Sequence, residues 1–149
     1  KMKIEMIVTD EKLVPHYKTL GSGACDLVAN IERPITIAPN SQVTIGTGLK
    51  IHIKNPKFGG FMIPRSGKGS KGLVLGNLVG LIDSDFQGEI KIPLWNRSSA
   101  PITVEPFEPV VQFAILPLIQ AKFQMVEKFG MKTKRGEGGF GHTDKKGEK

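Results

Sequence analysis

The abundance of β-branched residues in a chain punctuated by glycine and proline constrains the fold most strongly. Ile, Val and Thr together number 33 against only six Ala, and Gly and Pro together number 28 of the 149 residues. β-Branched side chains are stiff about their first torsion and fit a pleated strand better than a helix. No long window shows apolar residues at helical spacing. The chain is therefore predicted to be an all-β protein with many short strands.

The expected strands are apolar runs separated by turn signals such as Asn55-Pro56. They cover Lys3–Val8, Gln42–Thr44, Leu49–Ile53, Phe61–Ile63, Glu89–Trp95, Ile102–Val104, Val110–Leu116 and Ala121–Glu127. The segment Leu81–Gly88 is interpreted as strand, turn and strand, which is a β-hairpin, and a short helical turn fits near Gly69–Gly72. Many short strands with this punctuation indicate a β-barrel or a sandwich.

The composition changes at Met131, where Lys, Gly, Glu and Arg become dominant and apolar residues nearly vanish. A segment that buries so little apolar surface does not offset the entropy lost on ordering. We therefore expect a β domain over residues 1–130 and a flexible, Gly-rich C-terminal arm over residues 131–149. Phe140 is the apolar exception within the arm.

The net charge of +7 comes mainly from two segments. Residues 54–72 hold five basic residues and no acidic one, and residues 131–149 hold six basic residues against three acidic ones. A basic surface favours an anionic partner such as a nucleotide or a nucleic acid, although charge alone also serves solubility. A single cysteine, Cys25, excludes an intramolecular disulfide, and no signal-peptide pattern precedes it. A reducing, cytoplasmic setting is therefore expected.

Arg65, Ser66 and Gly67 form a candidate phosphate site. The glycines from Gly67 to Gly72 match a dinucleotide fingerprint only as a string, because no helix of sufficient length is expected to follow them. An arginine, a hydroxyl and nearby backbone amides can still hold phosphate oxygens, and a plain turn is the alternative. No histidine stands in a recognisable relation to Ser66, which disfavours a role as a nucleophile.

Three of the five aspartates, Asp26, Asp83 and Asp85, lie beside glycine- and turn-rich sequence. Aspartate is common in turns for conformational reasons alone. The functional alternative is a carboxylate that orients a water molecule or holds magnesium near phosphates. The residues by themselves therefore indicate a β protein with a candidate polyphosphate site and a mobile tail.

Five motifs, in order, resemble those of the homotrimeric dUTPases, which cleave dUTP to dUMP and pyrophosphate. They are Gly23–Leu27, Pro64–Gly67, Gly76–Gly88, Glu108–Gln112 and Arg135–Thr143. The resemblance covers about residues 20–143. It implies a distorted jelly roll or β-barrel, a homotrimer whose sites are shared between subunits, and Mg²⁺ as cofactor. The activity that it implies would supply dUMP and keep uracil out of DNA. It implies neither a nucleic acid nor a membrane as a partner.

The resemblance also implies roles for particular residues. Asp83 is the base that activates the attacking water, and Asp26 holds the metal through water, so that no side chain binds Mg²⁺ directly. In the arm, Arg135 contacts phosphate and Phe140 stacks on the base. The other expected substrate contacts are Arg65, Ser66, Gly67, Asn77, Leu81, Ile82, Phe86, Lys91 and Gln112.

Several residues depart from the family's motifs. Phe86 replaces a tyrosine, Lys68 a leucine, Phe107 a glycine and Pro109 an arginine, the loop before Gly76 is one residue short, and the arm ends in His142-Thr143-Asp144. Two other functions stay open. One is a dCTP deaminase-like enzyme of similar fold, and the other is a basic β-barrel that binds nucleic acid, a class that needs an exposed aromatic platform.

Overall fold

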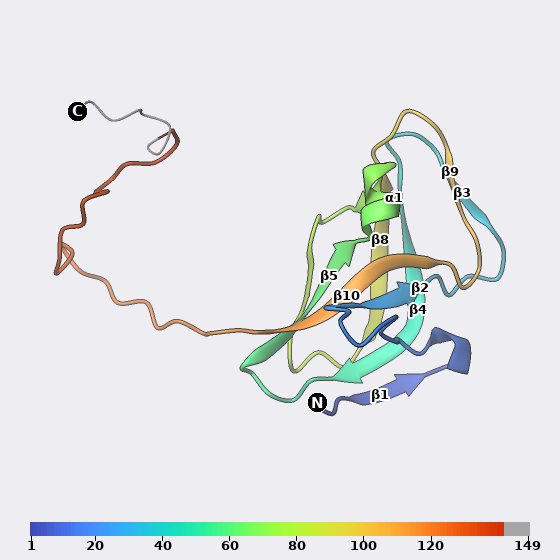
Figure 1. The fold of residues 1–149 in the computed structure, drawn as a ribbon, viewed down its shortest axis with the longest axis horizontal. Helices are drawn as coiled ribbons and strands as arrows, with labels where there is room; N and C mark the ends of the chain where they lie inside the picture. The colour runs from blue at the N-terminus through green and yellow to red at the C-terminus, as the bar shows by residue number, and fades with distance from the viewer. Residues whose placement is uncertain (142–149) are drawn as a thin grey trace.

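The structure is a computed structural model, and it describes residues 1–141. Two four-stranded antiparallel sheets enclose one core (Figure 1). Sheet A has the strand order β1-β4-β8-β6, with β1 Glu5–Val8, β4 Gln42–His52, β8 Glu89–Asn96 and β6 Leu73–Leu75. Sheet B has the order β2-β10-β5-β7, with β2 Cys25–Val28, β10 Pro109–Pro117, β5 Phe58–Pro64 and β7 Gly80–Ile82. This double sheet confirms the expected all-β fold and fits a distorted jelly roll.

The remaining elements are small. Strands β3 (Ile35–Ile37) and β9 (Ile102–Val104) form a two-stranded ribbon. Helical structure in residues 1–141 is limited to the 3-10 turn η1 (Glu11–Leu13) and to the five-residue helix α1 (Ser66–Ser70). The expected helical turn therefore exists but begins three residues earlier than predicted. In the same part of the chain, no helix has the length and apolar character needed to cross a membrane.

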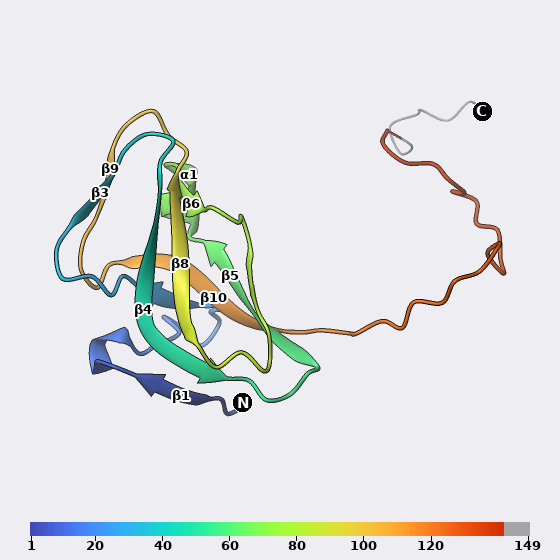
Figure 2. The same ribbon diagram turned by 180° about the vertical axis from the view of Figure 1, so that it is seen from behind.

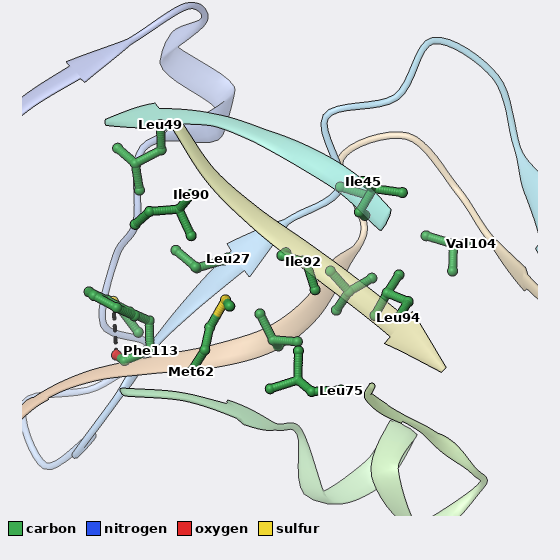
Figure 3. Packing of buried hydrophobic residues seen from close by; sticks show 14 of the residues in the cluster. Leu27, Ile45, Leu49, Met62, Leu75, Ile90, Ile92, Leu94, Val104 and Phe113 are labelled. Atoms are coloured by element: carbon green, nitrogen blue, oxygen red, sulfur yellow. Dashed lines mark hydrogen bonds between the residues drawn. The ribbon is translucent and has the colours of Figure 1, made fainter. Parts of the chain in front are cut away.

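The core follows the two-residue period of the strands. Alternate residues of β8, namely Ile90, Ile92 and Leu94, are almost completely buried, whereas Lys91 between them is exposed. Met62 and Phe113 of sheet B belong to the same cluster, so the two sheets share one apolar layer (Figure 3). Each sheet therefore has one buried face and a second face that is available for other contacts.

The expected strands Gln42–Thr44 and Leu49–Ile53 belong to one continuous strand, β4. Its glycines interrupt the apolar pattern without ending the strand. The register of β4 against β8 shifts between Gly46 and Lys50, and Gly48 has a φ of +65°. Between these two pairs β4 holds two more residues than β8, and this β-bulge absorbs them while pairing continues on both sides.

The predicted β-hairpin around Asp83 is wrong. Strand β7 pairs with β5 in sheet B, whereas β8 pairs with β4 and β6 in sheet A. The residues between them, which we call the Asp83 loop (residues 83–88), cross from one sheet to the other. A strand–turn–strand pattern fits both a hairpin and a crossing between sheets, because the strands that pair with β7 and β8 lie elsewhere in the sequence.

The predicted strand Ala121–Glu127 is also wrong. The last strand, β10, ends at Pro117, and residues 118–141 leave the body of the protein as an extended segment (Figures 1 and 2). Ile119, Phe123 and Met125 alternate along it and are each more than 90% exposed. The alternation is typical of a strand, but a strand needs a neighbour for its backbone groups, and no described strand pairs with this segment.

Candidate active site

Three of the expected site residues gather at one end of sheet B, and we call them the phosphate-side cluster: Asp26, Arg65 and Gln112. Gln112 in β10 lies directly opposite Asp26 in β2 and opposite Ile63 in β5. Arg65 follows Ile63 by two residues. Because side chains two residues apart in a strand share a face, the register brings these side chains together.

Asp26 is the electrostatic centre of this cluster. It is only 6% exposed, and its Oδ1 accepts a hydrogen bond of 2.9 Å from Nε of Arg65. Nζ of Lys18 lies 3.9 Å from its Oδ2. Oδ2 is buried and has no hydrogen-bond partner among the described residues. One oxygen of the carboxylate is therefore committed to Arg65, and the other is available to accept a hydrogen bond.

The cluster lines a hollow of about 560 Å³ on the outer face of sheet B. Its polar end is formed by the cluster and by Lys18. Its apolar wall comes from β5 and β10, and the loop before β2 forms the remaining wall: Phe61, Ile63, Ala114 and Leu116, then Ser22, Gly23 and Ala24. Two cations at the end of an open hollow can hold an anion, and Gln112 adds an amide that both donates and accepts hydrogen bonds.

The loop that follows β5 keeps its backbone accessible beside the cluster. Ser66 and Gly67 are both exposed at the start of α1. A Cβ atom added to Gly67 would meet no other atom within 4 Å, so a ligand can approach the backbone there. Arg65 at the N-cap has only hydrogen-bond donors, so it cannot cap the free N–H groups of α1, and its side chain reaches Asp26. The geometry therefore suits phosphate oxygens at Arg65, Ser66 and Gly67.

The base-side segment, residues 77–88, lies elsewhere on the sheet. Asn77, Leu81, Asp83 and Phe86 are all exposed. The side chain of Ile82 packs against the core, so only its backbone can contact a substrate. Strand β7 is an edge strand of sheet B, and no described strand pairs with its outer side. Its free backbone groups can therefore hydrogen-bond a flat polar ligand.

Asp83 is far from the phosphate-side cluster within one chain. Ile82 is paired with Gly60, which places Asp83 about level with Gly59 and six residues from Arg65 along β5. Six residues of strand span roughly 20 Å. Asp26 is on the opposite edge strand of the four-stranded sheet, another three strand spacings or roughly 14 Å across. Lys91, on sheet A, is equally absent from the hollow.

Two contacts that the sequence did not indicate hold the Asp83 loop. The backbone N–H of Lys54 donates to the carbonyl of Ser84 at 3.0 Å. Nδ1 of His52 and Nε2 of Gln87 are 3.2 Å apart. Lys18 near Asp26 was missed as well. The sequence around these residues does not reveal their contacts, because the fold brings each one next to a partner that is distant in the sequence.

Two of the expected contact residues of the arm, Arg135 and Phe140, lie within the described part of the chain. Nε of Arg135 donates to the carbonyl of Gly138 at 2.8 Å, and Gly136 has a φ of +54°. The ring of Phe140 is fully exposed. The rest of the expected arm, residues 142–149 with the departure at His142-Thr143-Asp144, lies outside the described residues. Arg135 and Phe140 thus lie on a turn-rich segment that is separate from both parts of the site.

No group of three or more His, Cys, Asp or Glu side chains suited to a metal ion occurs in residues 1–141. Next to the cluster, Cys25 has a pKa that differs from the ordinary value. Burial raises the pKa of its thiol, which donates to the carbonyl of Phe113 at 3.3 Å. Cys25 faces the core side of β2, so it is a packing residue rather than a nucleophile.

The fold and the phosphate-side cluster define a class of jelly-roll proteins with a hollow on one sheet that is lined at one end by Arg65 and Lys18. The family model for dUTPase matches residues 10–144, and the chain belongs to the dUTPase family. It is 49% identical over 146 residues to the deoxyuridine 5'-triphosphate nucleotidohydrolase of Neisseria meningitidis serogroup A, covering 95% of this chain and 97% of that one. It is 48% identical to the enzyme of that name from Acinetobacter baylyi, covering 97% of this chain and 100% of that one.

Solved structures agree on the fold. A mutant dUTPase of Staphylococcus bacteriophage 80alpha with dUpNHpp superimposes with a TM-score of 0.83 at 20% identity, covering 96% of this chain and 99% of that chain. A mutant dUTPase of phage phi11 of S. aureus, described as revealing the coordination of a structural Mg(II) ion, has a TM-score of 0.76 at 17% identity, covering 87% and 99%. The family resemblance and the fold expected from the sequence are thereby confirmed.

Proposed function

We propose that this protein is a dUTP diphosphatase that hydrolyses dUTP to dUMP and pyrophosphate. Family membership over residues 10–144 and the name shared by the curated relatives support this activity. The structural observation that carries it is the phosphate-side cluster, where Arg65 and Asp26 lie beside Gln112 and the open backbone of Ser66 and Gly67. The reaction would supply dUMP and keep uracil out of DNA.

The proposed chemistry is attack of water on the α-phosphorus. The carboxylate of Asp83 accepts a proton from the water as the new oxygen–phosphorus bond forms. The bond from the α-phosphorus to its bridging oxygen breaks, and pyrophosphate leaves with that oxygen. Asp83 suits a base because its carboxylate is exposed and accepts no described hydrogen bond. A positioned base typically contributes about 10²- to 10⁴-fold to the rate.

The residues present fit a magnesium ion that is held through water. Mg²⁺ keeps several of its waters and prefers one or two carboxylates together with substrate phosphates. Oδ2 of Asp26 accepts no hydrogen bond from the described residues, so it can accept one from such a water. Magnesium bound there would neutralise charge on the phosphates. Arg65 and Gln112 orient the phosphates themselves.

We propose that the protein is a homotrimer. The outer face of sheet B exposes Ile63, Leu81 and Leu116 beside the hollow, at 37%, 52% and 42%. Contiguous exposed apolar surface of this kind is typical of an interface. The extended segment after Pro117 carries further exposed apolar side chains, and a neighbouring subunit would give it the partner that its own chain lacks among the described residues.

Assembly also explains the separation of the site residues. The α- and γ-phosphates of one nucleotide are joined through a single intervening phosphate, so they cannot reach groups that are roughly 20 Å apart. A site that combines the phosphate-side cluster of one subunit with Asp83 of another needs no such reach. The arm of the third subunit would then close over the nucleotide, with Arg135 on phosphate and Phe140 stacked on the base, a contact worth about 1–3 kcal/mol.

Base selection is assigned to the base-side segment. The amide of Asn77 and the free backbone edge of β7 can pair with the polar edge of uracil. A base with a different pattern of donors and acceptors would leave these groups unpaired, which discriminates strongly. Close packing of the main chain against C5 would exclude the methyl group of thymine. We place the enzyme in the cytoplasm, where Cys25 stays reduced.

The experiment is a pyrophosphate-release assay on dUTP, dTTP, dCTP and UTP, each with Mg²⁺ and with excess EDTA. The proposed function requires rapid release from dUTP with Mg²⁺ and much slower release from dTTP and dCTP. Equal turnover of dTTP and dUTP would overturn the base selection. Ammonia release from dCTP would indicate the deaminase alternative, and salt-sensitive retention of RNA without turnover would indicate the nucleic-acid-binding one.

A further inference from the structure

An ion pair outside the expected site ties the phosphate loop to sheet B. Nζ of Lys68 in α1 pairs with Oε1 of Glu108, in the turn just before β10. Both side chains are about three-quarters buried, at 25% and 24% exposure. Exposed ion pairs contribute little because water screens them, whereas a pair that is largely shielded is screened less. The contact can therefore hold two segments in a fixed relation.

Glu108 is a rigid acceptor. Its Oε2 accepts a hydrogen bond of 2.8 Å from the backbone N–H of Glu105. Its carbonyl oxygen accepts one of 2.9 Å from the N–H of Ala29, one residue after β2. Four residues later, Gln112 faces Asp26. The carboxylate that meets Lys68 is thus fixed to the same strands that carry the phosphate-side cluster.

The loop itself has little intrinsic order. Helix α1 has five residues, two of which are glycine, and an isolated helix of that length is unstable. Two ion pairs hold it, Arg65 to Asp26 at the residue preceding the helix and Lys68 to Glu108 within it, and Nη2 of Arg97 donates more weakly to the carbonyl of Gly69 at 3.5 Å. Ser66 and Gly67 lie between the two ion pairs.

We propose that Lys68 is a positioning residue, which together with Glu108 fixes Arg65, Ser66 and Gly67 for binding the β- and γ-phosphates. This inference rests on the proposed function. Lys68 is unsuited to be a direct phosphate ligand. Moving its ammonium to a phosphate would leave the partly buried carboxylate of Glu108 unpaired beside a second anion, which is costly.

The test is a double-mutant cycle of Lys68→Met and Glu108→Gln. The amide introduced by Glu108→Gln keeps an oxygen for the N–H of Glu105 while removing the charge that faces Lys68. Each single variant should raise KM for dUTP roughly tenfold, within the range of couplings between contacting charges, and the double variant should be no worse than either single one. Binding of dUMP, which lacks the two outer phosphates, should change less than about twofold, because the loop does not contact it.

Three controls separate the possible causes. Lys71→Met removes a charge from the same segment at an exposed position and should leave KM within about twofold. Lys68→Arg keeps the positive charge, so its KM for dUTP should stay close to the wild-type value. If Lys68→Met fails to fold, Lys68→Gln, whose amide can still donate to the carboxylate of Glu108, takes its place in the cycle.

The outcomes are distinct. Raised KM in Lys68→Met with unchanged or lowered KM in Glu108→Gln would make Lys68 a direct phosphate ligand and overturn the inference. Unchanged KM in both variants or additive effects in the double variant would overturn it too. Failure of the proposed function is seen separately, since the wild type would then release no pyrophosphate from dUTP.

Discussion

Arg65 and Asp26, which are 39 residues apart in the sequence, are joined by a 2.9 Å hydrogen bond from Nε to Oδ1. The bond spans sheet B from the end of β5 to β2 and passes the side chain of Gln112 on β10. It aims the guanidinium across the hollow and leaves Oδ2 of Asp26 without a described hydrogen-bond partner. One contact therefore shapes both the anion site and the proposed outer-sphere metal site.

Asp26→Asn tests both consequences. The amide keeps the shape of the side chain but loses its charge, which weakens the bond from Arg65. We expect the free energy of unfolding, measured in urea, to fall by about 1–2 kcal/mol. The Mg²⁺ concentration for half-maximal activity should rise several-fold. Glu32→Gln, which removes a negative charge from an exposed position, serves as control. An unchanged Mg²⁺ titration in Asp26→Asn would remove this residue from the metal site.

Asp83→Asn should retain the fold and lose activity by about 10²- to 10⁴-fold, because the amide cannot accept the proton of the attacking water. Asp85→Asn is a matched control, since Asp85 is also exposed and lies in the same loop. Single-turnover hydrolysis of dUTP and far-UV circular dichroism should be measured on both variants. Near-normal turnover by Asp83→Asn, or equal losses in the two variants, would assign the base to another group.

The sequence predicted the general fold because its signal is local. β-Branched runs and turn residues locate most of the strands to within a few residues, as in β8 and β10. The pairing of strands is not local. The Asp83 loop looks like a hairpin in the sequence, yet β7 and β8 join different sheets. Ala121–Glu127 has the alternation of a strand, yet no described strand pairs with it.

The site could be predicted only as a set of residues. Motif resemblance indicated Asp26, Arg65 and Gln112, and the register of β2, β10 and β5 brings them together. Lys18 and Lys54 were not predicted, and Glu108 was indicated only as the first residue of a motif, because a lysine or glutamate has no local pattern that reveals its partner. The distance between Asp83 and Arg65 was equally hidden, since it depends on which end of β5 each residue approaches.

Phe86 should set the preference for deoxyribose. Its ring lies against Gly88, where an added Cβ would be 2.7 Å from Cζ of Phe86. A ring in this place gives a 2′-hydroxyl neither space nor a partner, which costs about 1–3 kcal/mol. The kcat/KM for UTP should accordingly be about 5- to 150-fold below that for dUTP. Phe86→Ala should reduce the difference in kcat/KM between dUTP and UTP, and Phe86→Tyr should preserve it. Equal kcat/KM values for the two nucleotides in the wild type would refute the assignment.

Cys25 gives the stability a dependence on pH. Burial raises the pKa of its thiol above the ordinary value of 9.0. As the pH rises through that value, the unfolded chain loses the thiol proton while the folded protein keeps it, so the unfolded state binds fewer protons and stability falls. The stability advantage of the wild type over Cys25→Ala should therefore shrink between about pH 8 and about pH 10. Urea unfolding across this range measures it; a constant or growing advantage would contradict it.

The most direct test of the account is whether one active site takes Asp83 and the arm from different chains. Chains truncated after Lys134 keep Asp83, and Asp83→Asn chains keep the arm; each should be nearly inactive alone. After equal amounts are refolded together, about one site in four of a random trimer population should combine both intact parts, and dUTP hydrolysis should reappear at up to that fraction of wild-type activity. If hybrid trimers are confirmed by native mass spectrometry and still show no activity above that of the separate variants, each site is built within one chain and the account is contradicted.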